Sequence, residues 1–137
     1  MTIGAQYSDD GEVFNAAYGY RARHEFGFDQ LISIPRLLEK DPGTRQAVIQ
    51  LWHPSDLGAN TLDKACNMSM VFSIFGTRLD MTVFNRSNDL VFGGVTGANP
   101  VHFSYFQQWF ANQLKIPMGH LTFVSNNGHV YTEMPHW

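Results

Sequence analysis

Cysteine is almost absent from this sequence, and the single one, Cys66, limits the thiol chemistry that the chain can do. One cysteine excludes a disulfide within the chain and fits a reducing compartment. The sequence also lacks the features of a signal peptide, and no apolar run approaches the length of a membrane span. We therefore expect a cytoplasmic protein with no membrane partner.

Charged residues are also scarce, at 15% of the chain, and acidic residues outnumber basic ones by 12 to 9. A net charge of −3 argues against duplex nucleic acid as the main ligand, because neutralising phosphates requires an excess of basic residues. Hydrophobic residues, by contrast, make up 44% of the chain and include 11 phenylalanines. A small monomer has little interior for so much apolar surface, so we expect a homodimer.

Metal-binding and phosphate-cradling motifs are missing as well. The 6 histidines are scattered, with no pair four residues apart and no cluster with cysteine. No glycine-rich loop has the spacing of a P-loop. The sequence therefore indicates no metal site.

The first half of the chain predicts a flexible segment, a helix and a strand within one domain, residues 1–137. Residues 1–13 are polar and form the flexible N-terminal segment. Asp29 can cap a helix, and Pro35 makes that helix either start late or bend. The apolar residues of the helix share one face: Leu31, Ile34, Leu37 and Leu38. Residues 45–52 are apolar on both faces, which is typical of a buried strand.

The centre of the chain predicts a β-hairpin. Apolar and polar residues alternate on both sides of Gly76, which suits the first central position of a type II′ turn. The tight turn brings the outer ends of the strands together, so Cys66 and Arg86 should be neighbours. A cation beside a thiol favours the nucleophilic thiolate, although a solitary cysteine is more often a small buried apolar residue.

The second half predicts another helix and two short strands. Asn99 and Pro100 suit the N-cap and the first residue of the helix. Its apolar face consists of Phe103, Phe106, Phe110 and Leu114. Residues 121–125 and 129–131 predict strands on either side of a turn. The whole pattern predicts an α+β fold, a mixed sheet with two main helices packed on one side.

Several motifs occur in a characteristic order. Cys66 precedes the hairpin, Arg86-Ser87-Asn88-Asp89 follows it, and Gly93 lies in the next turn. The flanking motifs are Tyr18-Gly19 with Arg23, Asp29-Gln30-Leu31, Asp41-Pro42-Gly43-Thr44-Arg45, Trp52-His53-Pro54-Ser55-Asp56 and Gly128-His129-Val130-Tyr131. In order and spacing the chain resembles thymidylate synthase and the related pyrimidine nucleotide hydroxymethylases, over about residues 14–131. The resemblance implies a thymidylate-synthase-like fold.

The resemblance also implies a reaction. Cys66 would be the catalytic nucleophile that attacks C6 of a pyrimidine nucleoside monophosphate, such as deoxyuridylate or deoxycytidylate. A reduced folate, methylenetetrahydrofolate, would supply a one-carbon unit to C5. The implied substrate-binding residues are Arg45, Arg86, Ser87, Asp89, Asn99, His129 and Tyr131.

Roles follow for some of these residues. Arg86 and Ser87 would bind the phosphate together with Arg45 from a second copy. His129 and Tyr131 would hold the sugar. Asn99 would either contact the base, through one donor and one acceptor, or simply cap the helix. Asp89 would accept from the base or bind backbone amides.

Departures from the family's pattern leave two functions open. Residues 64–65 replace the prolines that precede the family's cysteine, and Asn67 replaces the histidine that follows it. Arg45 stands where the family has two arginines, and we find no match for the family's catalytic glutamate or its folate-closing segment. The chain is either a methyl- or hydroxymethyltransferase or a non-catalytic relative with a structural, assembly or nucleotide-sensing role.

Overall fold

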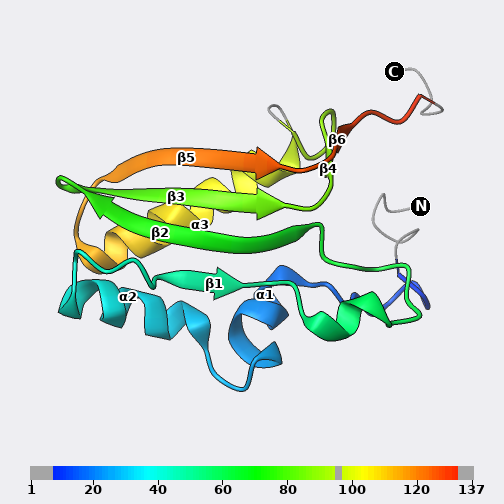
Figure 1. Cartoon of the computed structure of the whole chain (residues 1–137), viewed down its shortest axis with the longest axis horizontal. Coiled ribbons are helices and arrows are strands. Elements are labelled where there is room, and N and C mark those ends of the chain that lie inside the picture. The colour runs from blue at the N-terminus through cyan, green and yellow to red at the C-terminus, as the bar shows by residue number, and fades with distance from the viewer. Residues whose placement is uncertain (1–7, 95–96, 133–137) are drawn as a thin grey trace.

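The computed structural model describes residues 8–94 and 97–132 and is built around a four-stranded mixed sheet (Figure 1). The strand order is β1-β2-β3-β5. β2 runs antiparallel to both β1 and β3, whereas β3 and β5 run parallel. The strands are β1 (Val48–Gln50), β2 (Asn67–Phe75), β3 (Arg78–Asn85) and β5 (Met118–Ser125).

The predicted hairpin is confirmed. β2 and β3 pair from Phe75 opposite Arg78 back to Asn67 opposite Asn85. Gly76 has a φ of 62°, whereas Thr77 is not among the described residues with positive φ, as a type II′ turn requires.

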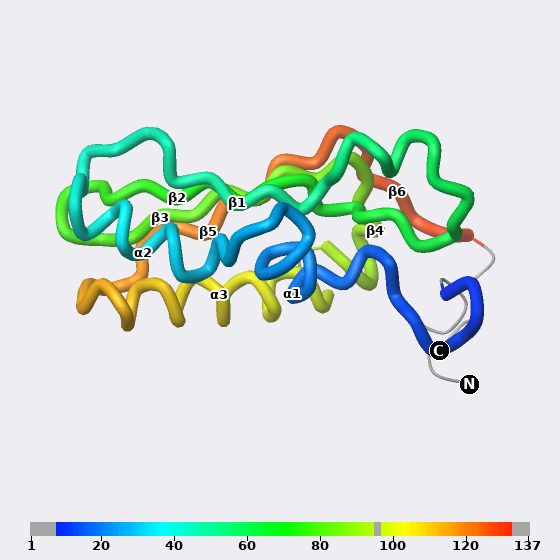
Figure 2. Tube along the Cα trace, turned by 90° about the horizontal axis from the view of Figure 1, so that it is seen from below, coloured from blue at the N-terminus to red at the C-terminus, as the bar shows by residue number. Residues whose placement is uncertain are grey.

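Both main helices lie on one face of the sheet, as Figure 2 shows. They are α2 (Gln30–Lys40) and α3 (Ala98–Leu114), and a short helix α1 (Tyr18–Tyr20) continues into a π-helical turn, Arg21–Glu25. The Asp29 carboxylate accepts from the backbone amides of Leu31 and Ile32, so the predicted cap is confirmed. Pro35 lies inside α2, so a late start of this helix is wrong.

The cap predicted for the second helix is also wrong. Gly97 occupies the N-cap position and Asn99 already lies inside α3. The Asn99 side chain instead donates from Nδ2 to Asn88 Oδ1 at 3.2 Å. Pro100 remains in the first turn, where its missing N–H costs nothing.

The core lies between the sheet and these helices. The Phe72 ring from β2 packs at a tilt against the Phe110 ring from α3, with centroids 4.6 Å apart, and the fully buried Phe103 belongs to the same core. The apolar faces predicted for both helices therefore pack on the sheet, which confirms the α+β fold. Within the described part of the chain, no helix is both long enough and apolar enough to cross a membrane.

Two strand predictions need correction. The strand expected over residues 45–52 is only β1, an edge strand whose Val48 is 40% exposed, so one of its faces is open in this chain. The strand expected over residues 129–131 covers only Gly128–His129, and the two last strands lie in different sheets. β5 pairs with β3, whereas β6 (Gly128–His129) pairs in parallel with β4 (Asn88–Asp89) in a separate two-stranded sheet.

The predicted flexible segment, residues 1–13, is described only from Ser8. Ser8 is buried and its hydroxyl donates to the Val13 carbonyl at 2.6 Å. The Asp9 carboxylate accepts from the Leu62 amide at 2.9 Å, which attaches this segment to the loop before β2.

Candidate functional site

Cys66 and Arg86 are neighbours at the end of the sheet where β2 begins and β3 ends. The Arg86 backbone amide donates to the Cys66 carbonyl at 2.9 Å, which extends the hairpin ladder past its last strand residues. The guanidinium Nη2 lies 3.8 Å from the Cys66 sulfur. The neighbourhood predicted from the hairpin is therefore confirmed, and it places a fixed cation against the thiol.

Backbone carbonyls hold the Arg86 guanidinium in place. Its Nε donates to the Ala65 carbonyl at 2.9 Å and its Nη2 to the Lys64 carbonyl at 3.0 Å. The guanidinium also lies 5.5 Å from the ring centroid of Trp52, within the range of a cation–π contact. Among the described residues these contacts use Nε and Nη2, so Nη1 keeps its two N–H groups for an anion.

The small β4–β6 sheet brings the next predicted residues to the same end. The Ser87 hydroxyl lies 3.5 Å from His129 Nδ1, and the His129 ring meets the Tyr131 ring edge-on at 5.0 Å. We call Cys66, Arg86, Ser87, His129 and Tyr131 the cluster around Cys66. Tyr131 is 51% exposed, so it lies at the rim of this cluster. Ser87 and His129, 42 positions apart in sequence, thus form one polar group with Tyr131.

Asp89 has a local role in this structure. Its Oδ1 accepts from the amides of Val91 and Phe92 at 2.8 and 3.2 Å, which closes the turn after β4. The sequence left open whether Asp89 accepts from a base or binds backbone amides. In this structure its carboxylate binds backbone amides.

Asn99 lies in the first turn of α3 and contacts Asn88, the residue that follows Ser87 in sequence. Its Nδ2 donates to Asn88 Oδ1, and Gly93 packs directly on this pair. A Cβ added at Gly93 would lie 2.8 Å from Asn88 Oδ1 and 2.9 Å from Asn99 Nδ2. The glycine is therefore required for the close approach of the turn to both amides.

Arg45 is not part of the cluster within one chain. It lies just before β1, and Val48 of β1 aligns with Val71 and, through it, with Thr82 of β3. Arg45 is therefore at the end of the sheet where β3 begins, whereas Arg86 follows the end of β3. A contribution of Arg45 to this site requires a second copy of the chain.

Sequence reasoning missed the polar residues underneath the thiol. Asn67 and Asn85 are buried and hydrogen-bonded to each other, and the Asn67 amide also donates to the Tyr18 hydroxyl at 2.6 Å. Burial raises the pKa of the Tyr18 hydroxyl above its ordinary value, so it stays protonated at neutral pH. The signal in the sequence was an asparagine at the end of each apolar strand, Asn67 in β2 and Asn85 in β3, which indicates a buried polar pair.

A second missed pair is buried away from this cluster. Arg21 makes a double hydrogen bond to Asp56, with Nη1–Oδ2 at 2.6 Å and Nη2–Oδ1 at 2.9 Å. The hydrogen bonds from Arg21 hold the pKa of the Asp56 carboxyl below its ordinary value. Nothing in the spacing of residues 35 positions apart could have paired them.

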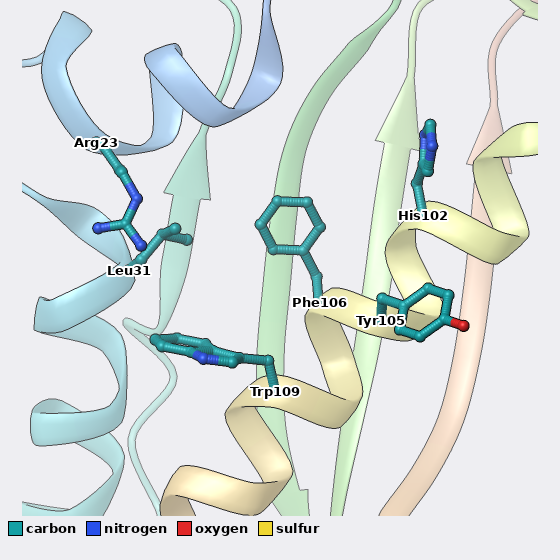
Figure 3. A pocket seen from close by; sticks show the side chains of 6 residues that line it. All are labelled: Arg23, Leu31, His102, Tyr105, Phe106 and Trp109. Atoms are coloured by element: carbon teal, nitrogen blue, oxygen red, sulfur yellow. The ribbon is translucent and has the colours of Figure 1, made fainter.

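An apolar groove of about 380 Å³ lies between α2 and α3 (Figure 3). Figure 3 shows Trp109 reaching from α3 toward α2, with Arg23 at the rim. The groove is lined by Arg23, Leu31, His102, Tyr105, Phe106 and Trp109. None of these residues belongs to the cluster around Cys66.

Comparisons with known proteins agree with this geometry. Residues 1–136 match the family profile described as thymidylate synthase. A deoxyuridylate hydroxymethyltransferase of Pseudomonas phage M6 is 44% identical over 130 residues, which is 93% of this chain and 37% of that protein. Another, from Bacillus phage SP01, is 36% identical over 140 residues, which is 93% of this chain and 36% of that protein.

A solved structure gives the same result for the fold. The crystal structure of thymidylate synthase from T4 phage matches with a TM-score of 0.75 at 26% identity. The match covers 85% of this chain and 40% of that chain. The chain thus spans well under half the length of each of these relatives.

Proposed function

Because the chain belongs to the thymidylate synthase family, we propose that it binds a pyrimidine deoxynucleoside monophosphate and that Cys66 adds to C6 of the base. Deoxyuridylate is the first choice, since two phage relatives are deoxyuridylate hydroxymethyltransferases. The observation that carries the proposal is the contact between Arg86 and Cys66, at 3.8 Å.

The phosphate end of the nucleotide binds at Arg86. Its Nη1 is the part of the guanidinium that is left for an anion, and Ser87 lies next to it in sequence with a hydroxyl that can donate. A guanidinium that is already oriented by two carbonyls loses little side-chain freedom on binding. His129 and Tyr131, joined to Ser87 through the imidazole, contact the sugar.

The chemical step needs a thiolate beside a base that can accept an electron pair. The Cys66 thiol gives its proton to solvent and its sulfur forms a bond to C6. The electron pair of the C5–C6 double bond moves to C5 and is shared with O4. C5 then takes a proton from solvent, and the reverse sequence restores the double bond and releases the thiolate. Arg86 favours the step because its positive charge stabilises the sulfur anion.

The family's one-carbon donor is methylenetetrahydrofolate, whose flat pteridine ring needs an apolar surface beside the thiol. The apolar groove between α2 and α3 does not supply this surface, because it shares no residue with the cluster around Cys66. We derive no step through the folate.

A homodimer completes the phosphate site. The sheet face away from the helices is open, with Val48 40% and Val124 46% exposed. A second copy packed on this face covers these side chains and brings an Arg45 that the chain's own fold keeps at the far end of the sheet.

A non-catalytic role is the second candidate, and one observation favours it. The same carbonyls that orient Arg86 also give this side chain a structural task, since it ties residues 64–65 to the end of β3. In that case the cluster would hold a nucleotide, or only the strand ends, without reaction at Cys66.

Exchange of the C5 hydrogen of deoxyuridylate separates these functions without any folate. Reversible addition of Cys66 to C6 replaces this hydrogen by deuterium in heavy water, and proton NMR measures the loss of the C5 signal. We expect exchange with the unmodified chain and none with Cys66→Ala, while binding of the nucleotide persists in both. Binding without exchange by the unmodified chain would establish the non-catalytic role instead.

A further inference from the structure

The ring of Trp52 lies against the guanidinium of Arg86, in a contact that the proposed reaction does not use. Trp52 comes two residues after β1, and its backbone amide donates to the Met68 carbonyl at 3.0 Å. Because β1 runs antiparallel to β2, the ring is at the end of the sheet where Cys66 and Arg86 meet. The Arg86 Cζ is 5.5 Å from the ring centroid, within the range of a cation–π contact.

The buried ion pair holds the backbone on both sides of Trp52. Arg21 Nη1 donates to the Leu51 carbonyl at 2.9 Å, and the Asp56 carboxylate accepts from the His53 amide at 3.0 Å. Arg21 and Asp56 are themselves joined by two hydrogen bonds. The peptide groups before and after Trp52 are therefore both fixed from the interior, so the ring is carried by a rigid backbone.

The hydrogen bonds of Arg86 leave one movement of its guanidinium unrestrained. Nε donates to the Ala65 carbonyl and Nη2 to the Lys64 carbonyl, and these two nitrogens share one edge of the planar group. A plane that is held at two points along one edge can still swing about that edge. Nη1 is on the opposite side of the plane, so it moves furthest when the plane swings.

We propose that Trp52 is a positioning residue for Arg86, whose guanidinium it holds so that Nη1 faces an anion bound beside the Cys66 sulfur. The ring blocks a swing toward itself, and the attraction of its π face for the cation opposes a swing away. The inference rests on the proposed function, in which the same guanidinium binds the nucleotide phosphate. The role requires no contact between Trp52 and the nucleotide.

Two alkylating reagents of different charge test this role without any nucleotide. Iodoacetate and iodoacetamide both form a bond between their CH₂ carbon and the sulfur and release iodide, but only iodoacetate carries a carboxylate. Because Cys66 is the single cysteine, mass spectrometry follows both reactions at one site. The ratio of the two rates, at pH 7 and low salt, reports the cation beside the sulfur.

The variants should order this ratio of iodoacetate to iodoacetamide rates. Arg86→Ala should lower it about fivefold, the effect of one unit charge about 4 Å away in water. Trp52→Leu should lower it about twofold or more, the effect of losing an exposed cation–π contact, and Trp52→Phe should restore most of the loss. Trp109→Leu is the matched control, because Trp109 lines the groove between α2 and α3, and it should leave the ratio unchanged.

A purely structural role of Trp52 would change both rates together, so an unchanged ratio in a folded Trp52→Leu chain would overturn the proposal. An unchanged ratio in Arg86→Ala would also overturn it, since no cation would then act at the sulfur. In case Trp52→Leu does not fold, fluorinated tryptophan incorporated into the whole chain weakens the π face and keeps the shape of the ring. The ratio should again fall, and an unchanged ratio would refute the positioning role.

The proposed function can fail separately from this inference. A chain that shows the expected order of ratios but neither binds deoxyuridylate nor exchanges its C5 hydrogen would overturn the proposed function alone. Trp52 would then still position Arg86, for an anion other than this nucleotide.

Discussion

The ion pair between Arg21 and Asp56 should be the most sensitive single point in the stability of this chain. Both side chains are almost fully buried, at 4% and 5% exposed, and two short hydrogen bonds join them. Arg21 also donates to the carbonyls of Leu51 at 2.9 Å and Asn15 at 3.0 Å. Removing the arginine leaves a buried carboxylate without its counterion and two carbonyls without a donor.

The expected loss is large on the scale of a small domain. Breaking a buried ion pair from one side costs about 3–5 kcal/mol, and a domain of this kind has about 5–15 kcal/mol of stability in total. Arg21→Met should therefore lower the free energy of unfolding by at least about 3 kcal/mol and the midpoint of thermal unfolding by roughly 10 °C. Replacing both residues, as Arg21→Met with Asp56→Leu, should cost less than the sum of the single changes, since no charge is left unpaired.

Urea unfolding followed by tryptophan fluorescence measures all three variants at pH 7. The pH dependence follows from the lowered pKa of Asp56, because the pair stabilises the fold above the ordinary carboxyl pKa, near 4, and this stabilisation is lost as the pH falls through the lower pKa of the folded state. Asp56→Asn should remove that part of the acid sensitivity. A loss below about 1 kcal/mol for Arg21→Met, or strictly additive single changes, would refute this reasoning.

Three further predictions concern the site and its assembly. Alkylation of Cys66 by iodoacetamide at neutral pH should slow in Arg86→Ala, because the cation that stabilises the sulfur anion is gone, and a thiol that is equally unreactive in both chains would contradict this. Deoxyuridylate should bind much more tightly than deoxyuridine, and its affinity should fall as the salt concentration rises. The affinity should also drop about tenfold or more in Arg86→Ala, since a charged hydrogen bond contributes about 1.5–3 kcal/mol. Equal heats of binding for nucleotide and nucleoside in calorimetry would mean that the phosphate site is absent. Sedimentation at micromolar concentration should show a dimer that Val124→Lys converts to a monomer, and a monomer in the unmodified chain would argue against the open sheet face as an interface.

Local signals predicted the elements that place Cys66 and Arg86. The alternation of residues around Gly76 and the two-residue turn determine the hairpin register as far as Ser69 opposite Phe84. A register shift between Asn67 and Ser69, which no local signal marks, then places Asn67 opposite Asn85 and brings the thiol next to the guanidinium. The apolar faces of α2 and α3 follow from their period of 3.6 residues, so the helical layer was also predictable.

Pairings between distant parts of the chain were not predictable in the same way. The parallel pairing of β5 with β3, across the whole of α3, has no turn chemistry to mark it, and β4 and β6 are too short for alternation to show. The Asn99 side chain could either cap α3 or contact Asn88, and the sequence gives no basis for deciding between these two positions. The hydrogen bonds that join Asn99 to Asn88, and Asn88 to Ser125, are distant contacts of this kind.

Gln107 attaches the middle of α3 to the sheet and so limits how this helix can move. This fully buried side chain donates to the carbonyls of Leu79 and His120, at 2.8 and 3.0 Å, where the register between β3 and β5 shifts. Gln107 thus bridges the two strands, and α3 cannot slide along the sheet without breaking these two hydrogen bonds. Asn99 lies eight residues earlier, about 12 Å along the helix axis. Any movement of Asn99 relative to the sheet must therefore be absorbed as bending within about two turns of α3, so the first turns of this helix form a stiff segment.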